Sequence, residues 1–387
     1  MATLNPRLLD TGSPPIPEIQ AWGGRYAGQG GLLNMCQAVP SHAPAPGMLE
    51  RLARAAGDPA CATYGPIMGD AALREAYAAD LGALYGGRVD AAEVAITAGC
   101  NQAYFVAMMA LAQRGDAVLL PTPWYFNHRM TLDMLGVEPR PLPCRAKRGF
   151  VPDPEEAAAL LDGRVRAIVL VTPNNPTGAI YPPEVIARFH DLCRKRGIWL
   201  VLDETYRDFL PPGQGRPHGL LAGGVWPENL VQLHSFSKSF AIPGHRLGAL
   251  GTPAALLPEL GKVMDCVQIC AGRAGQAALA WGLGALSAWR AANRAEMQTR
   301  AETVRAAFAR LPGWELKSLG AYFAYVQHPF GRTSAWQVAE RLASDHGLMC
   351  LPGPVFAGEE AHLRIAFANV DAAGIVTMED RLWAASP

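Results

Sequence analysis

One lysine lies in a sequence context unlike that of the other lysines. The chain has five lysines against 29 arginines, and Lys238 alone follows an apolar run, Leu230–His234, within the hydroxyl- and phenylalanine-rich segment Ser235–Phe240. Burial at a strand end would lower its proton affinity, and the neutral amine could then form a Schiff base with a carbonyl compound. A lysine that extends from a sheet edge into solvent is the alternative. The remaining lysines lie in charged or mixed segments, at positions 147, 195, 262 and 317.

Polar residues also follow three other apolar segments. Gly99-Cys100-Asn101 forms a glycine turn before an expected helix, where free backbone N–H groups suit a phosphate. Asn175-Pro176-Thr177-Gly178 and Asp203–Tyr206 follow two further apolar runs, and Arg246 lies eight residues beyond Lys238. Taken singly, these segments are equally typical of ordinary turns and solvated strand ends.

Apolar strands alternate with helical patterns through the middle of the chain. Asp70 is a candidate N-cap for an amphipathic helix over Ala71–Leu84. Fully apolar strands separated by helices predict a mainly parallel sheet covered on both faces, with ligands at the carboxyl ends of its strands. The expected strands are Val94–Thr97, Ala117–Leu120, Ala167–Thr172, Ile198–Leu202, Leu230–His234 and Leu247–Gly251, and the expected helices are Gln102–Ala112, Asn127–Leu135 and Pro183–Arg196.

The sequence pattern changes towards both ends. Residues 1–45 hold little periodic structure, and a long charged helix is expected over Arg290–Arg310 before a mixture of short strands and helices. We predict an α/β fold with a large domain over residues 46–289 and a smaller α+β domain built from residues 1–45 and 290–387. The length of 387 residues agrees with two or three domains.

Composition excludes several classes of function. The 34 basic and 34 acidic residues cancel, which argues against nucleic acid or an anionic membrane as the main partner. The G-x-G-x-x-G and G-x-x-x-x-G-K-[ST] motifs are absent, which argues against Rossmann NAD enzymes and P-loop NTPases. The eight cysteines form no zinc-ligand pattern, so no metal is expected. Without a secretory signal or a membrane-spanning apolar run, a cytoplasmic protein is expected.

The ordered set of motifs resembles the class I/II aminotransferases, a family of fold type I enzymes that use pyridoxal 5'-phosphate. The resemblance runs from about Leu32 to Phe367 and is carried by the set as a whole, since no member is specific alone. Its members are Tyr64, Gly69, Leu73-Arg74, Gly99-Cys100-Asn101, Pro123 to Tyr125, Asn175 to Gly178, Asp203 to Tyr206, Ser235 to Lys238, Arg246 and Arg364.

The resemblance implies roles for the residues around the cofactor ring. Lys238 would be the Schiff-base lysine, whose freed amine moves the proton between Cα and the cofactor. Asp203 would pair with the pyridine nitrogen, so that the ring can accept electrons. Asn175 and Tyr206 would hydrogen-bond the 3-oxygen of the ring. Tyr125 would stack on the ring, with Trp124 as the alternative if the register differs by one residue.

The resemblance also implies a phosphate site and a homodimer. The backbone of Gly99, Cys100 and Asn101, with the hydroxyls of Ser235 and Ser237 and the guanidinium of Arg246, would hold the phosphate. Ser237 can alternatively cap the following turn. Tyr64 would reach the phosphate of the neighbouring subunit, which implies shared active sites, although a core tyrosine is the other interpretation.

Substrate contacts are implied at four positions. Arg364 would bind the α-carboxylate of the substrate, unless an Asp or Glu of the chain pairs with it instead. Asn175 and the segment around Ala38 would adjoin the substrate, and Arg273 would cross to the neighbouring subunit. Ala38 replaces a glycine usual in the family, and His128 replaces a frequent tyrosine and could equally be a helix-surface histidine. The side-chain pocket is expected around Tyr26, Gln37 and Arg273, with its preference undetermined.

Three functions could use a cofactor site of this kind. The first is an aminotransferase of amino-acid metabolism and biosynthesis that moves an amino group between an L-amino acid and a 2-oxo acid by a ping-pong mechanism. The alternative is a pyridoxal-phosphate lyase, such as a β-eliminating C–S lyase, which would use the same cofactor residues. A cofactor-sensing regulator would need a DNA-binding domain, and residues 1–45 carry neither a helix-turn-helix pattern nor a basic patch.

Overall fold

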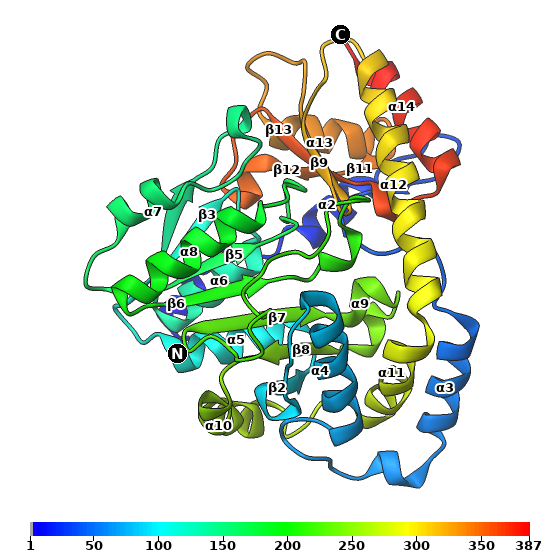
Figure 1. The fold of residues 1–387 in the computed structure, drawn as a ribbon. Helices are drawn as coiled ribbons and strands as arrows, with labels where there is room; N and C mark the ends of the chain where they lie inside the picture. Colours follow the sequence, from blue (N-terminus) through cyan, green and yellow to red (C-terminus); the bar gives the residue numbers. More distant parts are fainter. Residues whose placement is uncertain (1–2) are drawn as a thin grey trace.

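The computed structural model describes residues 3–387 as a large α/β body and a smaller body that contains the C-terminal part of the chain (Figure 1). Near the other end of the chain, Pro6–Asp10 packs against Phe126–Leu135 of the large body. The central sheet has seven strands in the order β2-β8-β7-β6-β5-β3-β4, and β8 runs antiparallel to both of its neighbours. The strands are β2 (Val94–Thr97), β3 (Ala117–Thr122), β4 (Glu138–Pro143), β5 (Val165–Val171), β6 (Trp199–Asp203), β7 (Leu230–Ser235) and β8 (Gly248–Gly251).

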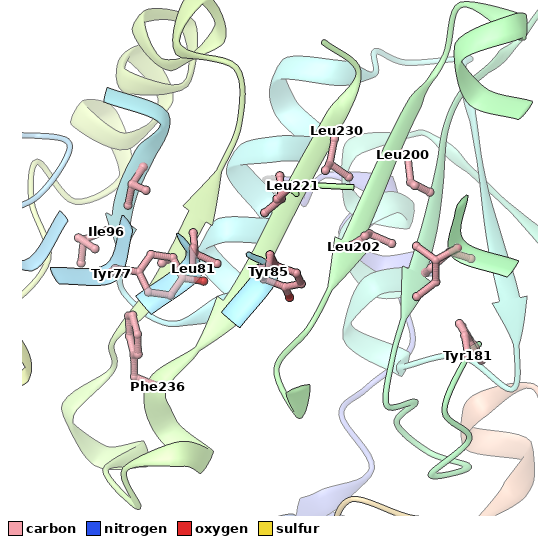
Figure 2. Close-up of a cluster of buried hydrophobic side chains, with 14 of the residues drawn as sticks. Tyr77, Leu81, Tyr85, Ile96, Tyr181, Leu200, Leu202, Leu221, Leu230 and Phe236 are labelled. Carbon is pink, nitrogen blue, oxygen red and sulfur yellow. The ribbon is translucent and has the colours of Figure 1, made fainter. Parts of the chain in front are cut away.

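Helices cover both faces of this sheet because its strands carry apolar residues on both sides. Leu200 and Leu202 of β6 point to one face, where they join a cluster that includes Tyr77 of α4, while Val201 points to the other (Figure 2). The predicted mainly parallel α/β architecture is confirmed. The helices are α1 (Pro6–Asp10), α2 (Ile16–Gly23), α3 (Pro46–Ala56), α4 (Ala71–Tyr85), α5 (Cys100–Leu111), α6 (Phe126–Leu135), α7 (Pro154–Leu160), α8 (Pro183–Arg196), α9 (Phe236–Ser239), α10 (Leu257–Val267), α11 (Arg273–Ala285), α12 (Ser287–Arg310), α13 (Ala335–Ser344) and α14 (Ala372–Ala385).

The smaller body has its own antiparallel sheet and its own hydrophobic cluster. Its four strands lie in the order β12-β13-β10-β9, and a separate parallel pair joins β1 to β11. The cluster combines Ile19 of α2 with residues from the second half of α12 onwards, among them Phe308 and Leu382. The strands are β1 (Leu33–Asn34), β9 (Glu315–Gly320), β10 (Phe323–Gln327), β11 (Leu348–Met349), β12 (Leu351–Pro352) and β13 (His362–Ala366).

One long helix connects the two bodies. Figure 1 shows α12, in yellow, running from the large body to the small sheet. Near its start, Arg290 bonds Asp80 and Asp208 of the large body, whereas Phe308 near its end packs in the small body. The domain boundary predicted at residues 289/290 falls within the first turn of this helix, and the division itself stays a prediction.

Two local predictions were incomplete. Strand β4 was not anticipated, because Pro139, Pro141 and Pro143 disfavour a strand in the middle of a sheet. Its position at the edge of the sheet explains it, since an edge strand needs backbone donors on one side only. Asp70 does precede α4, but its side chain makes no capping hydrogen bond and pairs with Arg273 instead.

Candidate active site

A cavity of about 550 Å³ opens at the carboxyl ends of the sheet strands. This is where ligands gather in open α/β sheets, and the volume is in the range of small-molecule sites. The cavity brings together residues that follow β2, β3, β5, β6 and β7 with Arg364 of β13. Its lining includes these predicted residues: Ala38, Cys100, Asn101, Tyr125, Asn175, Asp203, Tyr206, Ser235, Ser237, Lys238, Arg246 and Arg364.

Lys238 lies in α9, the single helical turn that follows β7, and its side chain is partly buried. Its Nζ donates a hydrogen bond to the carbonyl oxygen of Ala38, inside the cavity. Burial, followed by the positive charges of Arg364 and Arg246, lowers the pKa of this amine to about 7. About half of the amine is therefore neutral at pH 7, as a nucleophile or a proton carrier requires.

The other four lysines have different surroundings. Lys147, Lys195 and Lys262 are exposed, and Lys317 pairs with Glu315 on β9. The solvent-edge alternative for Lys238 is therefore wrong, because its amine points into the cavity towards Ala38.

Asp203 is held at the end of β6 by a histidine that was not assigned a role. The carboxylate Oδ2 lies 3.3 Å from Nε2 of His128, and its Oδ1 accepts the N–H of Thr205 at 3.0 Å. Burial alone would raise the pKa of Asp203, but the hydrogen bonds and charge contributed by His128 and Thr205 outweigh it and lower this pKa. The carboxylate is thus kept ionised although it is buried.

One interpretation of His128 was a residue on the helix surface, and this interpretation is wrong. It is buried on α6, and its ring stacks on Tyr104 with centroids 3.9 Å apart. Its ring also meets that of Tyr125 edge to face, with centroids 5.2 Å apart.

A corner of the cavity concentrates groups that bind anions. Cys100 and Asn101 begin α5, whose first-turn N–H groups have no partner within the helix. Gly99 precedes them with φ +83°, and a Cβ there would press against the guanidinium of Arg246. Arg246 donates to the carbonyl oxygen of Pro243 at 3.0 Å and faces Gly99 with its other terminal nitrogen.

Two serines complete this corner. Ser235 caps α9 by accepting the N–H of Ser237 at 3.3 Å, so the capping role considered for Ser237 belongs to Ser235. The hydroxyl of Ser237 is buried and has no hydrogen-bond partner among residues 3–387. A buried hydroxyl left without a partner is costly unless a ligand satisfies it.

Arg364 is buried without a carboxylate partner in the described part of the chain. Its Nη1 donates to Oδ1 of Asn175 at 2.8 Å, and its Nη2 donates to the carbonyl oxygen of Cys36. The rings of Phe323 and Phe356 lie on the guanidinium at 4.9 and 5.0 Å. Burial lowers its pKa to about 10. The chain itself therefore supplies no Asp or Glu for this arginine, and a ligand carboxylate would match it.

Aromatic residues border the same space. Tyr125 lines the cavity and its hydroxyl accepts a hydrogen bond from Asn127 at 2.8 Å, whereas Trp124 is buried in the core beside the sheet. Of the two register alternatives, the structure places Tyr125 at the cavity. Tyr206 is also buried, with its ring 5.3 Å from that of Tyr322, and burial raises the pKa of its hydroxyl well above the usual value.

Three expected residues lie away from this cavity within the single chain. Tyr64 is 79% exposed, so it is not a core tyrosine. Arg273 pairs with Asp70 at 3.3 Å, and its Nη1 donates to the Thr63 hydroxyl at 3.0 Å, directly after the short η1 turn (Pro59–Ala62). Tyr26 donates its hydroxyl to a nearby loop carbonyl and does not line the cavity.

Several lining residues were not anticipated. The chain reaches the cavity through Pro14 and Ile16 at the start of α2, which no periodic pattern in residues 1–45 indicated. Thr205 lies within the predicted segment Asp203–Tyr206, but its hydrogen bond to Asp203 was not predicted. The residues without a predicted role are Pro14, Ile16, Val39, Phe126, Asn127, Val171, Thr205 and Pro243.

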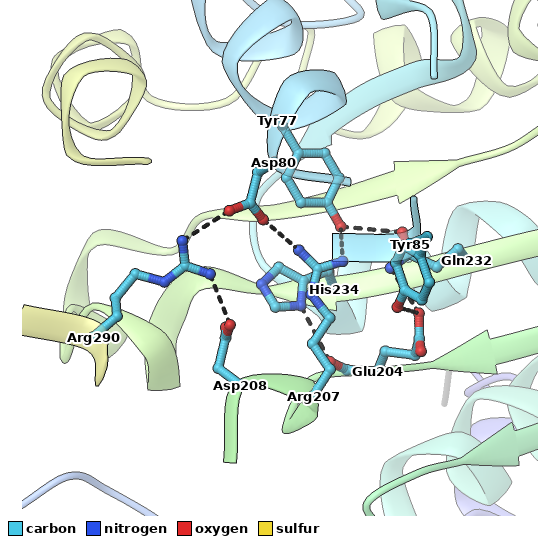
Figure 3. A network of polar contacts seen from close by, with 9 residues as sticks. All are labelled: Tyr77, Asp80, Tyr85, Glu204, Arg207, Asp208, Gln232, His234 and Arg290. Atoms are coloured by element: carbon cyan, nitrogen blue, oxygen red, sulfur yellow. Dashed lines mark hydrogen bonds and ion pairs between the residues drawn. The ribbon is translucent and has the colours of Figure 1, made fainter. Parts of the chain in front are cut away.

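A buried polar network supports the residues after β6 from the side of α4 (Figure 3). Glu204, next to Asp203, accepts hydrogen bonds from Tyr85 at 2.6 Å and Gln232 at 2.9 Å, and lies 3.3 Å from His218. Burial alone would raise the pKa of Glu204, but the charges and hydrogen bonds around it, with His218 foremost, lower this pKa to about 2.

The same network fixes the start of α12. Asp80 of α4 accepts hydrogen bonds from Arg207 and Arg290, both at 2.8 Å, and Arg290 also donates to Asp208 at 2.7 Å. Arg207 and Asp208 are buried and Asp80 and Arg290 are partly buried, and each charge has a partner of opposite sign, which is the condition for keeping charges inside a protein. Figure 3 shows Arg290 approaching from one side and Arg207 from the other.

Two absences hold for the part of the chain that the structure describes. No group of three or more His, Cys, Asp or Glu residues there could hold a metal ion. Among the same residues, the helices are all too short or too polar to cross a membrane.

Comparisons with known proteins agree with this geometry. Residues 31–382 match the family described as aminotransferase class I and II. The chain is 27% identical to the aromatic aminotransferase ISS1 of Arabidopsis thaliana, over 95% of this chain and 92% of that protein. It is 32% identical to the arginine–pyruvate transaminase AruH of Pseudomonas aeruginosa, over 78% and 77%. Its fold matches aspartate aminotransferase from Thermus thermophilus with maleate at a TM-score of 0.91 and 25% identity, over 100% of both chains.

The fold, with a lysine at the end of a strand in a mainly parallel sheet, defines a fold type I enzyme that depends on pyridoxal phosphate. Within that class, the chain belongs to the aminotransferase class I and II family and is a transaminase. The lyase alternative is not favoured, since the relatives named above transfer amino groups.

Pyridoxal 5'-phosphate is the cofactor of this family, and the cavity fits it. The unpartnered hydroxyl of Ser237, the unpaired N–H groups at the start of α5 and the guanidinium of Arg246 converge on one corner. A side chain at Gly99 would press against that guanidinium. These groups together suit a phosphate dianion, and Lys238 lies in the same cavity.

Proposed function

We propose that this cavity transfers the amino group of an L-amino acid to a 2-oxo acid by a ping-pong mechanism, with Lys238 as the covalent anchor of the cofactor. The observation that carries the proposal is the pair of Lys238, with its pKa lowered to about 7, and Arg364, buried without a carboxylate, in one cavity. When bound, pyridoxal phosphate supplies a carbonyl that takes up the amino group and a ring that accepts an electron pair.

The residues of the chain then have separate tasks. Arg364 binds the α-carboxylate of the substrate, with Asn175 holding its guanidinium at 2.8 Å. The amine of Lys238 removes the proton from Cα of the substrate and delivers it to the cofactor. A pKa near 7 suits an amine that must both accept and release a proton. Asp203, kept ionised by His128, offers a negative charge to the ring nitrogen, and Tyr206 offers a hydroxyl donor.

The phosphate is assigned to the corner at α5. The N–H groups of Cys100 and Asn101, the hydroxyls of Ser235 and Ser237 and the guanidinium of Arg246 are its donors. Tyr125 provides a ring surface at the same cavity. Ala38 takes part through its carbonyl, which holds the amine of Lys238.

The function is tested with the holoenzyme. Amino acid alone should bleach the visible absorbance of the bound cofactor in one turnover, and a 2-oxo acid alone should restore it. Steady-state rates with both substrates should give parallel double-reciprocal lines. Release of ammonia and pyruvate with no change of the cofactor band would instead indicate elimination.

A homodimer with shared sites is part of the proposal. Its support is Tyr64, a large aromatic side chain that is 79% exposed in the single chain. Arg273 is assigned to the same interface, where it orders the η1 turn next to Tyr64. The test is to mix Lys238→Ala and Tyr64→Ala subunits: mixed dimers should regain one good site, whereas no gain over either variant would exclude sharing through Tyr64. We also place the enzyme in the cytoplasm, in amino-acid metabolism and biosynthesis; expression of a fluorescent fusion tests the location.

A further inference from the structure

The charged residues of the cavity are few, and each already has a task. Along the cavity wall the described residues contribute only Asp203, Lys238, Arg246 and Arg364 as charged side chains. In the proposed function, Arg246 holds the phosphate, Arg364 holds the α-carboxylate, and Lys238 carries the proton. No cation of the wall is left for a second carboxylate on the substrate.

The remaining wall is largely apolar and comes from distant parts of the chain. Ile16 begins α2, Val39 follows β1 and Phe126 begins α6, and all three line the cavity. Val39 is 36% exposed there, with its N–H fixed by Oδ1 of Asn369 at 2.9 Å. Ile16 and Phe126 pack on the core of the smaller body, so their positions are set by buried contacts.

This wall is continuous with the surroundings of Arg364. The ring of Phe356 lies on the Arg364 guanidinium at 5.0 Å, and the ring of Phe126 lies 5.8 Å from that of Phe356. A substrate whose carboxylate binds Arg364 therefore has an apolar surface close to that carboxylate, separated from Arg364 by the ring of Phe356. The amides of Gln37 and Asn127 are the polar neighbours, and neither is charged.

The residue that was expected to bring a charge from another subunit is engaged in its own chain. Arg273 uses Nε for Asp70, and Nη1 for Thr63 and the carbonyl oxygen of Ala60 at 2.5 Å. With no free cation among the described lining residues of this chain, a second carboxylate would lose hydration without a compensating partner there, whereas apolar groups gain roughly fourfold in affinity per buried methylene.

We infer that the substrates of this transaminase are amino acids with uncharged, apolar side chains, received by the wall of Ile16, Val39 and Phe126. The inference rests on the proposed function, because it takes Arg364 as the carboxylate site and Arg246 as the phosphate site.

The first test compares half-reactions and binding on the holoenzyme. Leucine, methionine and phenylalanine should bleach the cofactor band with a kcat/KM at least roughly tenfold above aspartate and glutamate. In calorimetry, 4-methylpentanoate and 3-phenylpropanoate should bind more tightly than glutarate and succinate, which carry the second carboxylate. Equal or reversed preferences would overturn the substrate class alone, because the amino transfer would still be seen. A cofactor band that no amino acid changes would overturn the proposed function and this inference with it.

The second test moves a charge into the wall. Val39→Arg should raise the ratio of kcat/KM for glutamate over leucine by at least about fivefold, through a new ion pair and a lost apolar contact. Val225→Arg is the matched control, because Val225 is 78% exposed and does not line the cavity, and it should leave the ratio unchanged. An unchanged ratio in Val39→Arg would show that this wall does not face the substrate side chain.

Discussion

The state of the Lys238 amine before the cofactor binds can be measured directly. Burial and the nearby charges of Arg364 and Arg246 lower its pKa to about 7 from the ordinary value of 10.5. At pH 7 about half of the amine is then neutral, against roughly one part in 3,000 for an ordinary lysine, a difference on the order of a thousandfold. Because only the neutral amine attacks a carbonyl, capture of pyridoxal phosphate should accelerate as pH rises through 7 and level off above about 8.

The assay traps the adduct in cofactor-free protein. The protein is mixed with pyridoxal phosphate at a series of pH values, reduced with borohydride after short times, digested and mapped by mass spectrometry. The adduct should lie on Lys238, with a rate midpoint near pH 7, and should vanish in Lys238→Ala. The control Lys195→Ala removes an exposed lysine and should behave as the parent protein does.

The cause of the shift can be tested in the same assay. Arg364→Met removes the positive charge that lowers the pKa of Lys238 more than Arg246 does, so this pKa should rise and the midpoint should move to higher pH. Arg54→Met changes an exposed arginine far from the cavity and should leave the midpoint in place. An adduct on another lysine, or a parent midpoint near pH 10, would refute the reasoning.

Three more predictions concern the anion corner, the carboxylate site and the buried network. Gly99→Ala should weaken the binding of pyridoxal phosphate by roughly tenfold or more in equilibrium titration, since the added Cβ presses on Arg246. Gly115 has a similar φ of +92° with nothing near its Cβ, so the control Gly115→Ala should bind the cofactor normally. Arg364→Lys should lower kcat/KM at least ~30-fold with the cofactor spectrum retained, because it loses the paired donors of a buried arginine; the exposed Arg310→Lys is its control, and equal activity would remove Arg364 from substrate binding. Glu204→Gln should lower the free energy of unfolding at pH 7 by roughly 1–3 kcal/mol in urea, with the exposed Glu228→Gln unchanged. Because the pKa of Glu204 is lowered to about 2 from 4.5, its contribution is present above pH 4.5 and is lost as pH falls through 2; a gap from the parent that does not narrow over that range would count against the assignment.

The convergence of the site could be predicted from the sequence because parallel strands end at one edge of a sheet. Asp203 follows an apolar run directly, and Asn175 and Lys238 follow theirs within four residues, so locating the runs placed the side chains at one edge of the sheet. The strand β4 escaped prediction because its prolines are tolerated only at an edge, and edge position is a property of the assembled sheet.

Other features depend on contacts between distant segments. The pairing of His128 with Asp203 joins residues 75 positions apart, and nothing local to His128 distinguishes it from a surface histidine. The wall residues Ile16 and Val39 lie in a segment without periodicity, and only its folding over the cavity gives them a role. Tyr64 and Arg273 belong to a predicted interface, so one chain alone does not test them.

The central claim is that the cavity moves an amino group between two carbon skeletons. The most direct measurement uses ¹⁵N-labelled leucine and unlabelled pyruvate with the holoenzyme, followed by mass spectrometry of the products. Amino transfer predicts alanine carrying the label and an equal amount of 4-methyl-2-oxopentanoate, with both absent in Lys238→Ala. Label recovered as free ammonia, with no labelled alanine, would contradict the account.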